Sequence, residues 1–576
     1  MLEFIKISVT FLVALVKFII SNQLLKLFPP SLRPIVEVRQ GKLRGATSTL
    51  PNGSPYHYFK GVPYAKPPVG ELRFQAPVAI EKFYKPVVDC LVERSVCIQP
   101  IIGKFVVGKE NGLFLNIYTP KLPTNDQSDS MLPVMIWIHG GGFISGSADS
   151  FIYDPVYLVQ EGVIVVTMNY RLGALGFLSM PSVGITGNAG LKDQLLVFKW
   201  VNENIVHFGG NPANVTIFGE SAGSMSAYLH YLSPNSRKHF HRVICQSGVA
   251  CSESFFQSDG NDRALRLAKS LGYEGNDLQI ALETLRKAPV RLLIKHQNKV
   301  LNEREKRLVL RIPFLPVIEK KMTEDSIITE LPEQILKNWD TIRMPIINGC
   351  TDGEGILGLR MILNRLEQFD QEPERLVPQL MGELSESDRR FIGHEVKQFY
   401  FSGRKINENT MNEMCDLLSD NTFITNSVVS AEWIAIHQPN VKQYHYRFVY
   451  QGKLGITKKL FNLGHVSGVS HGDDIFYLFR SRMLPHVSDA SDECRVRNIF
   501  VRLWTNFAKY DDPTPNEDDP LLPCKWAKVM TVNKTNSQFD LDSLEINCKP
   551  TMVRNPCGRR LELWRNILQK YRRDFL

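Results

Sequence analysis

The sequence predicts an α/β fold with a large, mainly parallel central sheet that is covered by helices on both faces. Apolar, β-branched runs of strand length recur along the chain, and helical stretches such as 191–206 and 222–232 lie between several of them. Apolar residues make up 43% of the chain and charged residues 22%, which is typical of a globular protein with a large core. The predicted strands are 134–138, 163–168, 215–218, 243–245, 345–347 and 444–450.

Residues 1–30 differ from the remainder, 31–576, which is expected to form a single domain. Residues 7–16 are uncharged and mostly apolar, Lys17 follows them, and the two prolines at 29–30 would end a helix. At 100° per residue, the polar side chains of this segment fall within a sector about 60° wide. We therefore expect a hydrophobic helix that associates with a membrane or lipid-droplet surface. A cleaved secretory signal peptide and a helix packed on the protein are the alternatives.

The formal net charge of +9 is spread along the chain, with a local basic excess over residues 559–573. We expect a solvated C-terminal helix there, and contact with an anionic membrane surface is the alternative. No nucleic-acid-binding motif accompanies the charge. The ten cysteines match no zinc-binding spacing, and ten in a chain of 576 residues do not form a disulfide scaffold. The sequence predicts no metal and no organic cofactor.

The segment Gly219–Gly223, with the sequence Gly-Glu-Ser-Ala-Gly, follows the apolar run 215–218. This arrangement is typical of a serine on a sharp turn between a strand and a helix, where the flanking glycines let the neighbouring backbone approach closely. The predicted helix 222–232 then directs its N-terminus at the serine. Ser221 is therefore the candidate nucleophile.

Three consecutive glycines, Gly140–Gly142, follow His139 directly after the predicted strand 134–138. Backbone N–H groups in such a run are not shielded by side chains. An acyl-transfer enzyme needs donors of this kind to stabilise the oxyanion of its tetrahedral intermediate. A flexible turn is the alternative for the run in isolation, but a nearby serine elbow favours the oxyanion interpretation.

A serine nucleophile needs a histidine that takes its proton and an acid that orients the histidine. In this architecture the chain order is serine, then acid, then histidine. Two loops fit this order: one holds Asp352 and Glu354 after the predicted strand 345–347, and the other holds His471. The residue pattern alone leaves open which acid serves, and it does not single out His471 among the 13 histidines.

Longer motifs resolve these choices by resemblance. The segment 208–223 is similar to the serine signature of the type-B carboxylesterase and cholinesterase family, and further segments resemble family motifs in the same order. These segments are 61–65 with 67–70, 169–173 and 187–194. The resemblance spans about residues 34–576 and is greatest to the insect alpha-esterase branch. It implies an α/β-hydrolase fold.

The resemblance also implies a role for each site residue. Ser221 would be the nucleophile, Glu354 the acid and His471 the base, and the backbone N–H groups of Gly141, Gly142 and Ala222 would bind the oxyanion. Ser247 resembles the serine that supports the acid. Arg73 and Glu110 resemble a structural salt bridge of the family, for which an ordinary surface pair is the alternative.

Departures from the family pattern concern its two usual disulfides. The segment 110–116 has Gly112 where the family has a cysteine, and Cys251 has no partner before Cys350. The loss of both bridges favours an intracellular, membrane-associated protein that faces the cytosol, at the endoplasmic reticulum or lipid droplets. Secretion after cleavage of a signal peptide is the alternative.

We therefore expect a serine carboxylic ester hydrolase, a carboxylesterase, that acts on lipophilic or xenobiotic esters through an acyl-enzyme and is susceptible to organophosphates. Cholinesterases hold the quaternary ammonium of choline on an aromatic platform. No tryptophan precedes Trp137, so this platform is missing from its expected region and choline esters are unexpected substrates. Glu220 weighs against a juvenile hormone esterase, in which glutamine is typical. Phe143, Phe314 and Phe476 are candidates for an apolar acyl pocket. The rival functions are a slow-turnover scavenger and a non-catalytic adhesion-type binding protein.

Overall fold

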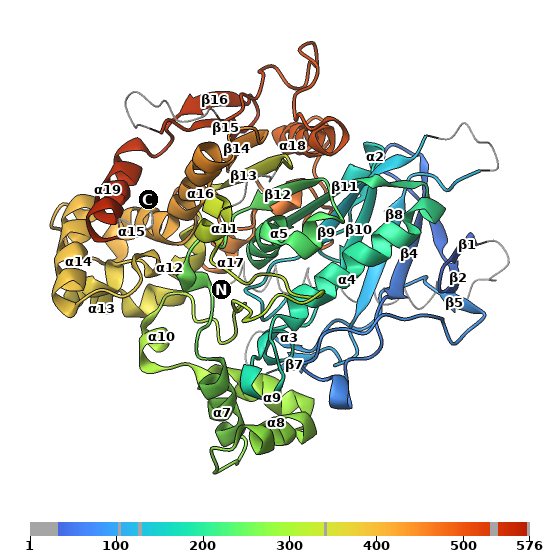
Figure 1. Cartoon of the computed structure of the whole chain (residues 1–576). Helices are drawn as coiled ribbons and strands as arrows, with labels where there is room; N and C mark the ends of the chain where they lie inside the picture. Colours follow the sequence, from blue (N-terminus) through green and yellow to red (C-terminus); the bar gives the residue numbers. More distant parts are fainter. Residues whose placement is uncertain (1–32, 102–104, 125–129, 339–342, 530–538, 573–576) are drawn as a thin grey trace.

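The computed structural model describes residues 33–101, 105–124, 130–338, 343–529 and 539–572. The predicted helix over residues 1–30 lies outside these residues. Within them the chain builds a central sheet that crosses the molecule, with helices gathered around it (Figure 1).

The described central sheet has 11 strands in the order β16-β15-β14-β13-β12-β11-β9-β10-β8-β4-β3. The strands from β15 to β10 pair in parallel, and the pairs at both edges are antiparallel. The prediction of a large, mainly parallel sheet is therefore confirmed. The strands are β3 (Ala46–Thr49), β4 (Pro55–Pro63), β8 (Phe114–Thr119), β9 (Leu132–Ile138), β10 (Ile164–Met168), β11 (Gly210–Glu220), β12 (Arg242–Gln246), β13 (Ile346–Thr351), β14 (Gln443–Phe448), β15 (Asp542–Ile546) and β16 (Thr551–Arg554).

Two hydrophobic clusters form on the two faces of this sheet, because successive side chains of a strand point to opposite sides. In β9, Ile136 belongs to the first cluster and Trp137 to the second. The first cluster includes α4 (Ala189–Asn204) and α5 (Ala222–Leu232), and the second includes α2 (Val156–Gln160) and α18 (Asp492–Tyr510). Helices therefore cover both faces, as the near-continuous apolar strands predict.

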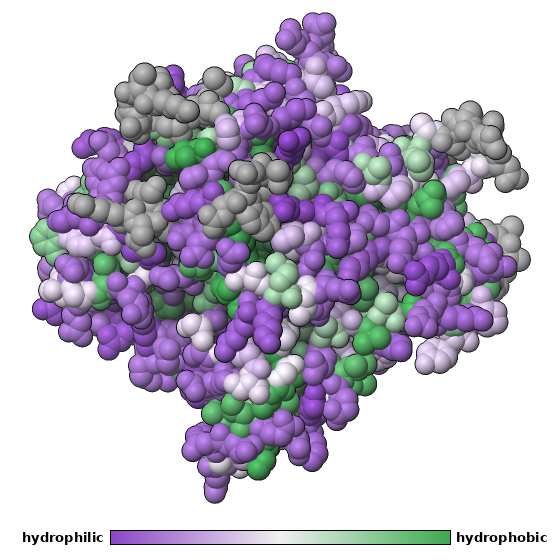
Figure 2. All heavy atoms as spheres, viewed as in Figure 1, coloured by the Kyte–Doolittle hydropathy of each residue, from purple (hydrophilic) through white to green (hydrophobic). Residues whose placement is uncertain are grey.

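Two further groups of helices lie beside the sheet (Figure 1). One group, drawn in green at the bottom, contains α7 (Gly260–Ser270), α8 (Leu278–Lys287) and α9 (Val290–His296). The other group lies on the left and includes α12 (Ile356–Ile362), α14 (Glu386–Phe401), α15 (Met411–Ser419), α16 (Thr425–His437) and the C-terminal α19 (Gly558–Tyr571). The molecular face in Figure 2 is mostly hydrophilic, with hydrophobic residues collected near the lower helical group.

Shorter elements complete the described chain and connect these groups. A three-stranded sheet is formed by β1 (Ile35–Val38), β2 (Gly41–Arg44) and β5 (Val87–Asp89), and a two-stranded one by β6 (Gln99–Pro100) and β7 (Val106–Val107). The remaining α-helices are α3 (Gly173–Phe177), α6 (Pro234–Arg237), α10 (Glu303–Arg307), α11 (Pro332–Asn338), α13 (Leu366–Gln371) and α17 (Thr457–Leu460). The carboxyl ends of the parallel strands β9, β11 and β13 point to one edge of the main sheet, where the candidate site lies.

Candidate active site

Ser221 occupies a strained turn between β11 and α5. Its backbone angles are φ 57° and ψ −124°, a combination that side-chain-bearing residues adopt only when the surroundings enforce it. A Cβ on Gly223 would lie 2.0 Å from the carbonyl oxygen of Ile138, and one on Gly219 would lie 2.5 Å from the backbone of Gly223. Only glycine fits these two positions, so the Gly-x-Ser-x-Gly pattern has a direct steric cause.

Glu354 follows β13 and is fully buried against His471. Its Oε2 lies 2.5 Å from Nδ1 of the imidazole. Its Oε1 accepts hydrogen bonds from the Ser247 hydroxyl at 2.6 Å and from the Thr351 N–H at 2.7 Å. This carboxylate is therefore fixed on both oxygens, in the arrangement that orients a catalytic histidine.

Asp352, the other acid that the sequence offers, makes no hydrogen bond or ion pair with the imidazole in the described structure. Its Oδ1 accepts a hydrogen bond from the Val469 N–H at 2.7 Å. Burial raises the pKa of this carboxyl, and the Val469 N–H partly opposes that effect. Of the two acids in the loop, Glu354 is the one that contacts His471.

Glu220 contacts the opposite nitrogen of His471, which sequence reasoning missed. Its Oε1 lies 3.0 Å from Nε2, without hydrogen-bond geometry, and both atoms are buried. Burial raises the pKa of Glu220 to about 8, although His471 opposes this shift. The sequence signal was the single charged residue inside the elbow motif.

The charge state of His471 reflects two opposing influences. Burial disfavours the imidazolium, but the carboxylates of Glu220 and Glu354 outweigh burial and raise the pKa of His471 to about 9. Asp474 adds to the same effect. Within the described part of the chain, the Ser221 hydroxyl makes no hydrogen bond to His471. The imidazole therefore lies between two carboxylates in this conformation.

A π-helical turn, η11 (Asp420–Ile424), packs on the histidine. It interrupts a continuous helix made of α15 and α16. The ring of Phe423 stacks on the His471 imidazole with centroids 4.3 Å apart and an interplanar angle of 27°. On the same turn, Asp420 is fully buried and pairs with Arg560 of α19 at 2.9 Å. Such turns concentrate at functional sites, and this one fixes a face of the imidazole.

The glycine run after β9 forms a loop beside Ser221, where a Cβ on Gly140 would lie 3.0 Å from the Ser221 Cβ. Gly141 and Gly142 have φ angles of 109° and 61°, and no acceptor for their N–H groups lies within the described residues. His139 is buried, its ring stacks on Tyr170 at 4.4 Å, and the Tyr170 hydroxyl donates to the His139 carbonyl at 2.8 Å. Ala222 begins α5, so its N–H is also free of an intrahelical acceptor. These three N–H groups are therefore free to donate hydrogen bonds to an oxyanion.

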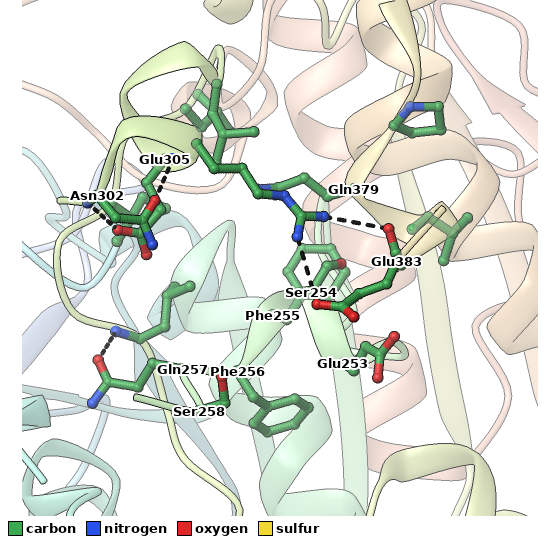
Figure 3. A pocket seen from close by; sticks show the side chains of 18 of the residues that line it. Glu253, Ser254, Phe255, Phe256, Gln257, Ser258, Asn302, Glu305, Gln379 and Glu383 are labelled. Carbon is green, nitrogen blue, oxygen red and sulfur yellow. Dashed lines mark hydrogen bonds and ion pairs between the residues drawn. The ribbon is translucent and has the colours of Figure 1, made fainter. Parts of the chain in front are cut away.

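A chamber of about 1420 Å³ lies next to these groups, although Ser221, His471 and the three oxyanion donors are not among the residues that line it. Met225, one helical turn after Ser221, lines it, as does Ile312, whose Cδ1 would lie 3.8 Å from a Cβ on Gly142. Thr422 of η11 lines it as well. Figure 3 shows part of the wall, where Phe255 and Phe256 lie among polar residues such as Gln257 and Ser258. The chamber exceeds the volume of an ordinary ligand pocket of about 300–1,000 Å³.

The three phenylalanines proposed for an acyl pocket do not line this chamber. Phe143 packs edge-on against Phe177 with centroids 5.0 Å apart, and Phe314 is fully buried in the same hydrophobic cluster. Phe476 belongs to the cluster on the other face of the sheet. Their assignment to substrate binding stays a prediction.

The sequence profile described as the carboxylesterase family matches residues 32–564. The chain belongs to the carboxylesterase family.

Insect esterases are among the relatives of this family member. It is 31% identical over 503 residues to esterase E4 of Myzus persicae, covering 85% of this chain and 88% of that protein. It is also 31% identical over 519 residues to the juvenile hormone esterase of Tribolium castaneum, covering 85% and 86% of the two chains. Among solved structures, the crystal structure of juvenile hormone esterase from Manduca sexta with OTFP covalently attached matches with a TM-score of 0.79 and 27% identity, covering 93% of this chain and 100% of that one.

These likenesses confirm the family and the α/β-hydrolase fold inferred from the motifs. Together they support a carboxylic ester hydrolase.

Arg73 and Glu110 form a bidentate ion pair in this family member. Arg73 Nε and Nη2 donate to the two carboxylate oxygens at 2.5 and 2.8 Å. Nη1 donates to three backbone carbonyls at the C-terminal end of α8 and beyond, those of Leu285, Arg286 and Ala288. Both side chains are mostly buried. Through these hydrogen bonds, Arg73 connects the end of α8 to Glu110 in the segment before β8.

All ten cysteines of this family member are free thiols, and seven of them are buried. Within the described residues, no group of three or more His, Cys, Asp or Glu side chains could hold a metal ion. No helix in the same residues combines the length and apolar character needed to cross a membrane.

Proposed function

We propose that this protein is a serine carboxylesterase that hydrolyses lipophilic or xenobiotic carboxylic esters through an acyl-enzyme. The observation that carries the proposal is the contact between Glu354 and His471 beside a serine in a strained elbow. Glu354 is ordered by Ser247 and Thr351, so it would hold the imidazole in the tautomer whose Nε2 accepts a proton.

In the first step, the Ser221 oxygen attacks the ester carbonyl carbon, and His471 Nε2 takes the hydroxyl proton. The negative charge on the carbonyl oxygen is stabilised by the N–H groups of Gly141, Gly142 and Ala222. Collapse of the tetrahedral intermediate breaks the bond to the alkoxy oxygen, which receives the proton from His471. In the second step, water attacks the acyl-enzyme with His471 as base, and the acid leaves. The residues of this chain suffice for both steps without a cofactor.

The chamber supports a lipophilic substrate. Apolar side chains that include Met225, Ile312, Leu315 and Leu417 line it, and its volume can hold a long or bulky acyl or alcohol group. Organophosphates would phosphorylate Ser221 in the same site, because the attack on phosphorus uses the same nucleophile and donors.

A slow-turnover scavenger is the second candidate function. Glu220 lies 3.0 Å from Nε2 of His471, the nitrogen that must also activate the water that releases the acyl group. The geometry around Ser221 weighs against a non-catalytic adhesion protein, because such a protein has no need of a strained serine beside an ordered Glu–His pair.

The test is labelling with a fluorophosphonate probe together with hydrolysis of an aryl ester. We expect stoichiometric labelling of wild type at Ser221 and loss of labelling and turnover in Ser221→Ala, with kcat lower by roughly a millionfold. Full hydrolysis by Ser221→Ala would overturn the proposal. A stoichiometric burst followed by slow release of acid would assign the scavenger function, and an absence of both labelling and turnover in wild type would assign the binding protein.

We also propose that residues 1–30 place the protein on a membrane or lipid-droplet surface that faces the cytosol. Secretion after cleavage of these residues is the alternative. Mass spectrometry of the mature protein tests the alternative, because a peptide that contains residues 1–26 is detected only if these residues are not cleaved as a signal peptide.

A further inference from the structure

The chamber runs from Met225 and Ile312, which lie next to the proposed site, to a rim that carries several arginines. Residues 307–310 and Ile312 line it over this distance: Ile312 lies near Gly142 of the glycine run, and Arg307 lies at the rim. Phe369 and Arg375 line the neighbouring wall. An ester that fills the chamber would therefore reach from Ser221 toward these arginines.

Four arginines form what we call the arginine rim: Arg307 and Arg375, which line the chamber, and Arg365 and Arg311, which adjoin them. The guanidinium groups of Arg365 and Arg375 both donate to the carbonyl oxygen of Arg307, at 2.9 and 3.5 Å. Arg365 also lies over the ring of Phe369, 5.7 Å from its centroid. The rim thus gathers several cationic groups from segments that are far apart in the sequence.

Carboxylates at the rim are too few to balance these cations. Glu372 pairs with Arg375 at 2.9 Å, and Glu303 pairs with Lys306 at 2.7 Å. In the described part of the chain, no carboxylate lies within ion-pair distance of Arg307, Arg311 or Arg365. Glu374 lines the chamber but makes no ion pair with the rim.

A buried donor within the rim has no partner. The Arg375 side chain is 11% exposed, and its Nε is buried without a hydrogen-bond acceptor in the described residues. Burial, and then the charges of Arg311 and Arg375, lower the pKa of Arg365, which Glu372 only partly offsets. An unpaired buried donor and mutual repulsion both destabilise the empty rim, and a bound anion would relieve both.

Two other arginines near the chamber, Arg304 and Arg572, have acidic partners. Arg304 lies 3.9 Å from Glu383, and Arg572 lies 3.2 Å from Glu253, near the residues labelled in Figure 3. The arginine rim differs from these two pairs in that Arg307, Arg311 and Arg365 have no ion pair among the described residues.

We propose that the arginine rim binds an oxyanion, a carboxylate or a phosphate, carried at the far end of an amphipathic ester whose apolar part fills the chamber and whose carbonyl lies at Ser221. This inference rests on the proposed function. It assigns specificity to an anionic terminal group, for which guanidinium groups provide paired, charge-assisted hydrogen bonds.

The test compares three long-chain p-nitrophenyl esters that differ only at the far end of the acyl chain: a free carboxylate, a phosphate monoester and a methyl-capped carboxylate. For wild type, we expect a lower KM for an anionic ester than for the capped one. In the double variant Arg307→Gln/Arg311→Gln, the ratio of the capped-ester KM to the anionic-ester KM should fall about tenfold, because two charged contacts are lost. Both side chains are exposed, and neither makes a side-chain hydrogen bond in the described structure.

The matched control is Arg39→Gln/Lys287→Gln, which removes the same charge at exposed positions outside the chamber. It should leave the KM ratio unchanged. An equal change in the control, or a wild-type ratio near unity for both the carboxylate and the phosphate, would overturn the inference. A preference for one of the two anions identifies the terminal group.

Calorimetry separates this inference from the proposed hydrolysis. The Ser221→Ala variant is titrated with non-hydrolysable ether analogues of the three compounds. Tighter binding of an anionic ether that is lost with Arg307→Gln/Arg311→Gln supports the rim even if no ester is turned over. Equal binding of all three ethers contradicts the rim even if the neutral ester is hydrolysed.

Discussion

Glu220 Oε1 lies 3.0 Å from His471 Nε2, the nitrogen that a serine nucleophile must reach. Replacing Glu220 with Gln removes this negative charge but keeps the size of the side chain. Because burial opposes the imidazolium and the carboxylates favour it, the pKa of His471 should fall from about 9. The base must be neutral to accept a proton, so kcat/KM rises with pH through this pKa. We expect the acid limb of the pH profile of Glu220→Gln to move to lower pH.

The measurement is kcat/KM for a neutral aryl ester from acid to alkaline pH. Glu354 and Asp474 also face the imidazole and remain charged partners in the variant, so the shift is incomplete. The surface variant Glu203→Gln serves as control. An acid limb that stays in place or moves to higher pH would contradict this prediction.

Glu354 and Asp352 lie in one loop, but only Glu354 contacts the imidazole. Glu354→Gln should lower kcat by roughly ten-thousandfold, because an amide no longer holds the imidazole in the correct tautomer. Asp352→Asn keeps an oxygen that accepts from the Val469 N–H and should retain most of the activity. Steady-state kinetics of both variants check the assignment, and similar losses in the two would refute it.

Gly141 and Gly142 differ in the space available for a side chain. A Cβ on Gly141 would lie 2.1 Å from the Ser145 carbonyl oxygen, whereas the nearest atom to one on Gly142 is at 3.8 Å. Gly141→Ala should displace the loop and lower kcat about 100- to 1,000-fold through loss of an oxyanion donor. Gly142→Ala encounters only the left-handed backbone penalty of about 1–2 kcal/mol and should be milder. The rates of aryl ester hydrolysis and fluorophosphonate labelling rank the two, and the reverse order would be inconsistent with the proposed oxyanion site.

The buried pair of Arg73 and Glu110 should contribute to stability. Arg73→Met leaves Glu110 without its cation and should destabilise the protein by about 3–5 kcal/mol. The double variant Arg73→Met/Glu110→Gln should recover part of this loss, since no unpaired charge remains. Thermal unfolding measures both, with Lys306→Met in an exposed pair as a control that changes little. A double variant less stable than the single one would contradict this account.

The centre of the fold was predictable because its strands are buried on both faces. Each of the six predicted segments coincides with a strand, with β11 the most extended relative to its prediction, Gly210–Glu220 instead of 215–218. The strands toward both edges of the sheet were not predicted. In β4 and β8, tyrosine, histidine and asparagine interrupt the apolar runs, and charged residues interrupt or flank them in β15 and β16. Their pairing depends on the neighbouring strand more than on local composition.

The site was predictable where motifs recur and hidden where distant segments meet. Ser221, Glu354 and His471 stand in recognisable motifs, although spacing alone could not choose between Glu354 and Asp352. The approach of Glu220 to His471 and the stacking of Phe423 on the same ring depend on tertiary packing that no local pattern contains. The chamber and its arginine rim likewise arise from segments around residues 307, 365 and 375 that the sequence does not connect.

The π-helical turn η11 sets the rotational phase of the long helix that runs from Met411 to His437. An α-helix advances about 100° per residue, so one extra residue in the turn rotates the side chains of α16 about the helix axis relative to those of α15. Deleting Thr422 would restore regular helical bonding. It would also turn Phe423 away from the imidazole or Asp420 away from Arg560, because a regular helix cannot keep both alignments. The turn η11 thus holds Asp420 against Arg560 of α19 and Phe423 against the His471 imidazole at the same time.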